Sequence, residues 1–117
     1  MILTDVTREA GVSFRHESGA RGKLYNPETF GTGCGWFDHD GDGRIDLLFV
    51  NSNSLEGDLD PSATSILYRN LGNGRFEDVT AKAGLDVPIY GMGFVSADVD
   101  GDADQDLLLY GLHRSVF

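Results

Sequence analysis

Two short stretches of the sequence place aspartates at alternate positions, a spacing that suits a cation site. Residues 38–46 have aspartates at positions 1, 3, 5 and 9 of the stretch, and residues 98–106 add one at position 7. Alternate residues of a tight loop can turn their carboxylates toward one centre, and Ca²⁺ takes about six to eight oxygen ligands from carboxylates and carbonyls. The sequence therefore predicts a calcium site in each stretch.

The predicted ligands are the loop aspartates and, at position 7, a backbone carbonyl. Gly43 at position 6 of the first loop permits a sharp turn. The second loop has Ala103 there, and because an alanine at positive φ costs about 1 kcal/mol, we expect a weaker second site or a different backbone. The predicted set is Asp38, Asp40, Asp42, Arg44 (through its carbonyl) and Asp46, then Asp98, Asp100, Asp102, Asp104 and Asp106.

Two other interpretations of these loops are disfavoured. An EF-hand needs a glutamate at position 12, where this chain has Phe49 and Leu109 inside predicted strands. An acidic surface loop without metal would leave four or five carboxylates repelling one another within nine residues, and no basic cluster nearby in the sequence neutralises them. His39 lies at position 2, which should point away from the metal, so we expect it to be exposed.

The two loops belong to a repeated unit. Gly31–Asp38 matches Gly91–Asp98 with an offset of 60 residues, whereas residues 5–11 match residues 78–84 with an offset of 73. The additional 13 residues fall in the polar stretch between Val12 and Phe30. We interpret this stretch as a long loop or arm that includes a short strand at residues 12–16.

The pattern between the matched segments is that of an all-β protein. Short runs of β-branched, aromatic or leucine residues are bounded by Gly, Asp, Asn or Pro, and residues 72–74 (Gly-Asn-Gly) predict a hairpin turn. A single helical turn is expected at residues 80–84, with Thr80 as N-cap and Gly84 as C′ residue. The predicted strands are Gly33–Phe37, Leu47–Val50, Ile66–Arg69, Phe76–Val79, Gly93–Ala97 and Leu107–Tyr110.

A four-stranded antiparallel unit repeated at this spacing suggests β-propeller blades. The four strands of a blade are lettered A to D in chain order. We expect a D-type strand and long loop in residues 1–30, a complete blade in 31–84, and the A and B strands of a second blade in 85–117. A closed ring would need on the order of 400 residues, so this chain should supply about one full blade and parts of two others. Because repeat units bury their faces on neighbours, we expect a fragment of a longer propeller or copies that associate.

Composition restricts the possible partners. Nine Lys and Arg stand against nineteen Asp and Glu, a net charge of −10 that argues against nucleic acid and anionic membranes. The longest apolar stretches, about five residues, are too short to insert into a membrane. Cys34 is the only cysteine and is expected to be buried, while Trp36 and Phe37 are expected to pack between blades. The N-terminus lacks signal-peptide features, which predicts a cytoplasmic chain unless it is a mature fragment with a start Met.

The repeated motifs resemble the FG-GAP/VCBS repeat of integrin α-subunit β-propellers. More closely, they are similar to the bacterial relatives of cartilage acidic protein, the ASPIC/UnbV-associated group. The resemblance covers nearly the whole chain. Its motifs are Gly31-x-Gly33, the loop of residues 38–46, the run Leu67–Phe76, Asp78-Val79-Thr80, Ala83-Gly84-Leu85 and Tyr90–Gly93.

This resemblance implies Ca²⁺ in both loops, a structural role for the metal, and an extracellular or periplasmic setting. It implies adhesion, or binding of a protein or glycan, rather than catalysis. Three alternatives remain open. Copies could self-associate to complete blades; the chain could be part of a propeller enzyme, although no nucleophile–base pair is visible; or it could be a calcium sensor, which would need a bistable helix pair.

Overall fold

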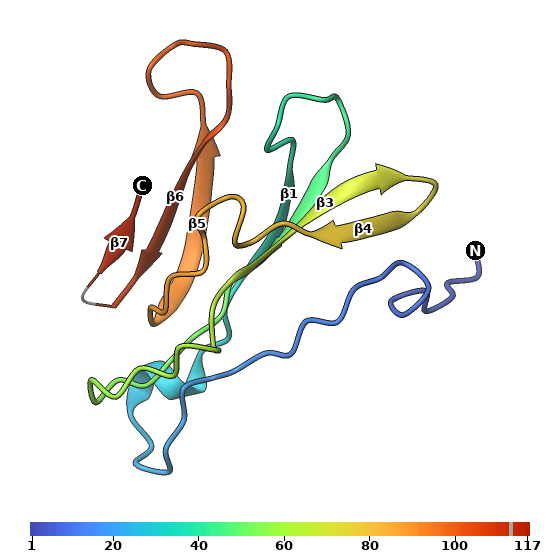
Figure 1. Ribbon diagram of the computed structural model, residues 1–117. Coiled ribbons are helices and arrows are strands. Elements are labelled where there is room, and N and C mark those ends of the chain that lie inside the picture. Colours follow the sequence, from blue (N-terminus) through green and yellow to red (C-terminus); the bar gives the residue numbers. More distant parts are fainter. Residues whose placement is uncertain (113) are drawn as a thin grey trace.

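Two antiparallel β-sheets, joined by loops and preceded by a long N-terminal arm, make up the computed structural model, which describes residues 1–112 and 114–117 (Figure 1). The arm ends in a short 3₁₀ helix, η1 (Asn26–Thr29). The first sheet has the strand order β1-β2-β3-β4 and the second the order β5-β6-β7. The strands are β1 (Cys34–Phe37), β2 (Asp46–Phe49), β3 (Ile66–Gly72), β4 (Arg75–Asp78), β5 (Gly91–Ala97), β6 (Asp106–Gly111) and β7 (Ser115–Val116).

The all-β prediction is confirmed, and each of the six predicted strands forms within a few residues of its expected bounds. The hairpin between β3 and β4 also forms, with Asn73 and both neighbouring glycines at positive φ. The second sheet differs from the prediction, because β7 adds a third strand to the expected two. A strand of two residues is too short to show an alternation of apolar and polar residues in the sequence. Only the pairing of β7 with β6 reveals it.

Strand register places both aspartate loops in the same way. Phe37, which precedes the first loop, pairs with Asp46, which ends it. Ala97 and Asp106 form the equivalent pair in the second sheet. Each loop is therefore a closed connection between the first two strands of its sheet, and both loops lie at the same end of the molecule (Figure 1).

The core lies between the two sheets. Phe37, Leu48 and Leu67 of the first sheet form a buried cluster, against which Phe94 and Leu107 of the second sheet pack. Leu48 is fully buried. A second cluster continues this interface and contains Val50, Ile89 and Leu109, with Val87 and Val116 at its edge.

The outer face of the first sheet corrects two predictions. Successive residues of a strand point to opposite faces, so Cys34 and Trp36 turn away from the face that Phe37 buries. Cys34 is exposed, and Trp36 is 60% exposed. The expectation that Cys34 is buried is therefore wrong, and of the two aromatic residues only Phe37 packs between the sheets.

The N-terminal arm forms no strand in residues 1–33, all of which the structure describes. The expected D-type strand and the short strand at residues 12–16 are thus wrong. A D-type strand needs the third strand of its own blade as hydrogen-bonding partner, and none of the described strands pairs with residues 1–33. Instead the arm follows the outer face of the first sheet, where Phe14 stacks on Phe49 with ring centroids 4.5 Å apart and the Ser13 N–H donates to the Tyr68 hydroxyl at 3.0 Å.

The repeat is visible in the hydrogen bonds of two helical turns. The N–H of Ala10 donates to the carbonyl of Val6 at 2.8 Å, and in the second copy Ala83 donates to Val79 at 2.9 Å. Both turns begin with an aspartate that accepts from the N–H two residues later, Asp5 in the first and Asp78 in the second.

The predicted N-cap role of Thr80 is therefore corrected, because Asp78 caps the second turn. The Thr80 hydroxyl instead donates to the Asp78 carboxylate at 2.6 Å and accepts from the Leu67 N–H at 3.1 Å.

Among the described residues, no helix is long and apolar enough to cross a membrane.

Gly35 faces the ring of Phe94 on the second sheet, with no room for a side chain between them. A Cβ atom on Gly35 would lie 2.4 Å from the ring of Phe94. We expect Gly35→Ala to destabilise the fold by about 1–3 kcal/mol because the sheets must separate. Gly33→Ala is the matched control, since a Cβ there meets nothing within 4 Å. Urea unfolding of both variants checks this, and equal midpoints for the two would contradict the packing described above.

Candidate metal centre

The first aspartate of each loop folds the backbone around its own carboxylate. In the first loop Asp38 accepts hydrogen bonds from the N–H groups of Asp42 at 3.2 Å and Gly43 at 2.8 Å. In the second loop Asp98 accepts from Gly101 at 2.7 Å and Ala103 at 3.0 Å. The position 1 aspartate therefore shapes the loop through backbone hydrogen bonds, in addition to offering oxygens to a cation.

The following aspartates continue this arrangement two residues at a time. Asp40 accepts from the N–H of Asp42 at 3.3 Å, and Asp42 accepts from the N–H of Arg44 at 2.9 Å. Asp100 and Asp102 make the equivalent bonds in the second loop, at 3.1 and 2.9 Å. Aspartate readily forms such local turns, which explains why the alternate spacing bends the chain.

Ala103 adopts the same backbone conformation as Gly43. Its φ is +75°, against +81° for Gly43, and Gly41 and Gly101 are both positive as well. Of the two outcomes expected from Ala103, a different backbone is therefore wrong. The strain of an alanine in the left-handed region remains in the second loop.

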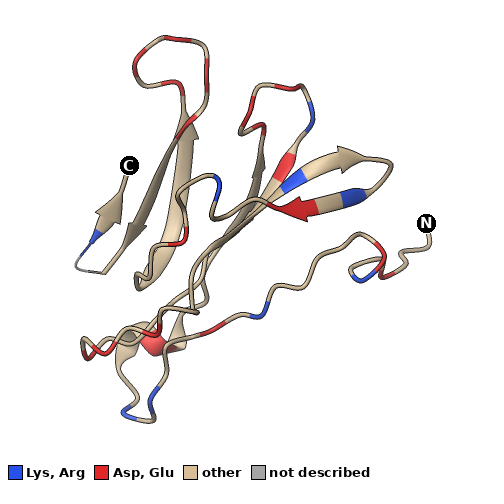
Figure 2. Ribbon diagram, in the orientation of Figure 1, with Lys and Arg blue, Asp and Glu red and all other residues tan. Residues whose placement is uncertain are grey.

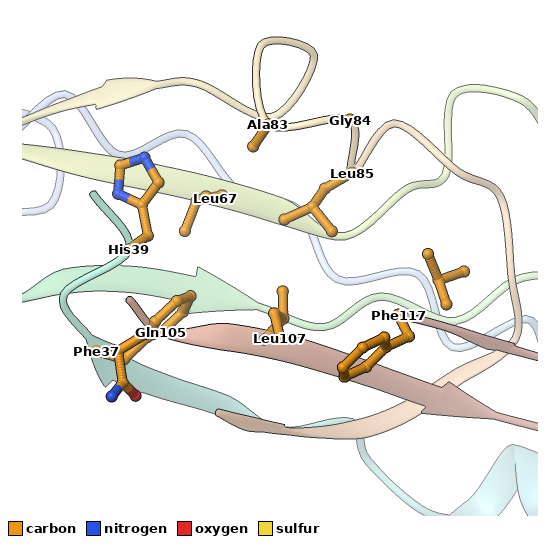
Figure 3. A pocket seen from close by; sticks show the side chains of 10 residues that line it. Phe37, His39, Leu67, Ala83, Gly84, Leu85, Gln105, Leu107 and Phe117 are labelled. Carbon is orange, nitrogen blue, oxygen red and sulfur yellow. The ribbon is translucent and has the colours of Figure 1, made fainter. Parts of the chain in front are cut away.

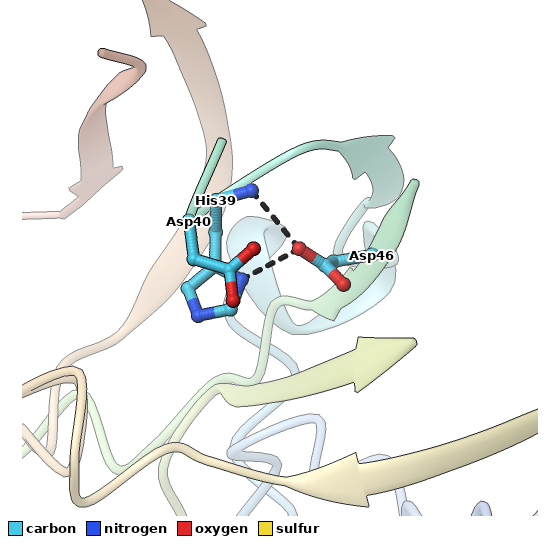
Figure 4. Close-up of side chains that lie close together, drawn as sticks. All are labelled: His39, Asp40 and Asp46. Atoms are coloured by element: carbon cyan, nitrogen blue, oxygen red, sulfur yellow. Dashed lines mark hydrogen bonds and ion pairs between the residues drawn. The ribbon is translucent and has the colours of Figure 1, made fainter. Parts of the chain in front are cut away.

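The last aspartate of the first loop is buried and fully engaged. One carboxylate oxygen of Asp46 accepts the Asn70 N–H at 2.7 Å, and the other accepts the His39 N–H at 2.9 Å and lies 2.5 Å from His39 Nδ1 (Figure 4). Burial raises the pKa of Asp46, but the hydrogen bonds from Asn70 and His39 outweigh it and lower the pKa below its ordinary value. Among the described residues, Asp106 accepts only the equivalent backbone bond, from the N–H of Val99 at 2.9 Å.

His39 corrects the expectation of an exposed side chain. Its side chain is only 18% exposed because it turns back to Asp46. It also lines an open cavity of about 240 Å³ between the sheets, together with Phe37, Leu67 and Leu107 (Figure 3). The described lining residues are mainly apolar, and His39 is the one titratable side chain among them.

The structure gathers some of the predicted ligands and separates others. Asp38, Asp40 and Asp42 can each place a carboxylate oxygen within 4.8 Å of the others, and Asp40 forms a further group with His39 and Asp46. In the second loop the gathered carboxylates are Asp98, Asp100 and Asp106. Neither loop brings its whole predicted set together, and Asp102 and Asp104 lie outside these groups. The gathered donors are carboxylate oxygens, the type that Ca²⁺ prefers, so they fit this ion.

Two arginines neutralise part of the first loop, a feature that the sequence analysis missed. Arg69 Nε lies 2.7 Å from Asp40 Oδ2, and Arg69 Nη2 lies 3.0 Å from Asp42 Oδ2. Arg44 forms an ion pair with Asp42 through its side chain. Arg69 is distant in sequence, and only the pairing of β2 with β3 brings it to the loop.

These contacts change the ionisation of Asp42 and distinguish the two loops. Partial burial raises the pKa of Asp42, but the Arg44 N–H, the Arg69 guanidinium and both positive charges lower it further than burial raises it. In the part of the chain that the structure describes, no ion pair reaches an aspartate of the second loop. Figure 2 shows a basic residue in the β1–β2 loop, whereas the β5–β6 loop carries acidic residues and no basic ones.

Sheets of matching register, each with an aspartate-rich loop between its first two strands, define a blade-type β-repeat protein. The FG-GAP-like repeat family matches residues 38–109, from the first loop aspartate to the middle of β6. Since this is more than half of the chain, the protein belongs to the FG-GAP-like repeat family. No curated protein and no solved structure matches it, so the narrower resemblance to relatives of cartilage acidic protein stays a prediction.

The equivalence of Gly43 and Ala103 gives a paired prediction. We expect Ala103→Gly to stabilise the protein by about 1 kcal/mol and Gly43→Ala to destabilise it by a similar amount, because both positions need positive φ. A Cβ at Gly43 meets nothing within 4 Å, so steric overlap would not explain the loss. Chemical unfolding in EDTA measures both changes without a cation. Shifts of the same sign in the two variants would contradict a shared loop backbone.

Proposed function

We propose that this protein is a calcium-binding β-blade module in which the metal has a structural role. The observation that carries the proposal is that two loops far apart in sequence share one strand register and four equivalent hydrogen bonds from backbone N–H groups to aspartates. Each of them gathers three carboxylates. Six carboxylates in two small groups repel one another, and a divalent cation at each group would remove that repulsion.

The proposed ligands are Asp38, Asp40 and Asp42 in the first loop and Asp98, Asp100 and Asp106 in the second. Asp46 positions the first site without binding the metal in this proposal, because its two oxygens already accept hydrogen bonds from the N–H groups of His39 and Asn70. The remaining predicted ligands, Asp102, Asp104 and the Arg44 carbonyl, would complete the coordination if the loops tighten around the ion. Bound Ca²⁺ would supply charge neutralisation and loop rigidity.

We further propose that the module acts outside the cytoplasm, by binding a protein or a glycan and without catalysing a reaction. The net charge of −10 makes a calcium-poor compartment unfavourable for the two loops. The outer faces of the sheets supply contact surface, since Trp36 is 60% exposed, Val95 52% and Tyr110 46%. The same exposed side chains favour self-association as a second candidate function, which the mass measured by light scattering would test.

Calcium is expected to stabilise the fold measurably. If each site binds with a Kd of roughly 10⁻⁴–10⁻³ M, then about 10 mM Ca²⁺ adds about 1.4–2.7 kcal/mol per site. In a domain of about 100 residues each kcal/mol raises the unfolding midpoint by about 4–8 °C. Thermal unfolding in Ca²⁺ and in EDTA measures this shift.

Two variants assign the shift to the loops. Asp40→Ala and Asp100→Ala should each remove about half of it, whereas Asp58→Ala, an exposed aspartate outside the loops, should retain all of it. An equal amount of Mg²⁺ should have a smaller effect, because Mg²⁺ dehydrates reluctantly. Coincident unfolding curves in Ca²⁺ and EDTA would refute the proposed function.

A further inference from the structure

Arg69 joins the first loop to a strand that is not part of it. Its guanidinium spans two carboxylates, with Nε 2.7 Å from Asp40 Oδ2 and Nη2 3.0 Å from Asp42 Oδ2. These are two of the three carboxylates that the first loop gathers. A planar guanidinium that bridges two carboxylates is an effective counter-ion, so the first loop is held together in the absence of a metal.

The same guanidinium has a second acidic neighbour. Glu77 on β4 lies directly opposite Arg69 on β3, and such cross-strand partners have adjacent side chains on one face of the sheet. Among the described residues Arg69 forms no ion pair with Glu77. Both residues line one open hollow beside Asp40, with a volume of about 310 Å³, so the guanidinium has space to move between the two acidic partners.

The binding of Arg69 to the loop is incomplete. Its Nε is buried, yet it makes no hydrogen bond of acceptable geometry in spite of its short distance to Asp40. A buried donor without a well-directed hydrogen bond is costly. The contact with Asp40 is therefore mainly electrostatic, and a guanidinium held in this way can be displaced by a stronger cation.

We propose that Arg69 is the built-in counter-ion of the first loop, and that it transfers from Asp40 and Asp42 to Glu77 when a divalent cation occupies this loop. This proposal rests on the proposed calcium-binding function. The second loop has no such counter-ion among the described residues, and Asp104 stands where the first loop has Arg44. The first loop thus has part of its charge neutralised without metal, at the cost of affinity, whereas the second loop, which folds in the same way, depends on a bound cation for neutralisation of its charge.

The test compares Arg69→Gln with Arg75→Gln. Arg75 is an exposed arginine on β4 without an ion pair to the described residues, so its variant controls for the loss of one positive charge. In EDTA, Arg69→Gln should unfold at a lower midpoint than Arg75→Gln, because only the former loses the bridge across two carboxylates. Equal midpoints would overturn the counter-ion role, and this result does not depend on calcium binding.

Calorimetric titration with CaCl₂ tests the transfer. Arg69→Gln should bind Ca²⁺ about five- to tenfold more tightly at one site than Arg75→Gln, and the ratio should shrink in high salt because exposed charges are screened. Glu77→Gln should weaken binding at that site, because the released guanidinium loses its acceptor. Unchanged affinity in both Arg69→Gln and Glu77→Gln, with calcium still bound, would overturn the transfer. If the unmodified protein does not bind Ca²⁺ in this titration, the proposed function is overturned, and the transfer of Arg69 with it.

Discussion

The pairing of Phe37 with Asp46, repeated as Ala97 with Asp106, is the constraint on which the remaining structure depends. It closes each aspartate loop at its base and fixes which face of the sheet every neighbouring residue occupies. Because Asp46 is fully buried, its carboxylate must be satisfied, and the N–H groups of His39 and Asn70 satisfy it. A slip of one residue would expose this carboxylate and would turn Phe37 away from the core.

The interface between the sheets follows from the same register. With Phe37 and Leu48 directed inward, Gly35 also faces the second sheet and leaves room for the ring of Phe94. Phe94 packs against both hydrophobic clusters, so the two sheets are held by one continuous apolar contact. That contact sets the relative position of the two loops, which lie at the same end of the molecule (Figure 1).

The two loops share a backbone but balance their charges differently. The first has four aspartates and is contacted by Arg44 and Arg69, whereas the second has five aspartates and no ion pair in the described part of the chain. Backbone N–H groups donate to the carboxylates in both loops, which lowers the cost of gathering them. The two loops therefore differ in charge as well as in the residue, Gly43 or Ala103, that adopts positive φ.

The sequence by itself determined six of the seven described strands, the repeat and the turns within each loop, because these leave a pattern in the order of the residues. Alternating apolar residues define strands, and aspartates favour turns in which the carboxylate accepts from the N–H two residues later. The tertiary structure alone decided which charges meet. Arg69 reaches Asp40 only through the pairing of β2 with β3, and His39 turns inward only because Asp46 is buried beside it. Likewise, the exposure of Cys34 and the irregular arm depend on which faces find a partner, and local sequence carries no signal for contacts made across such distances.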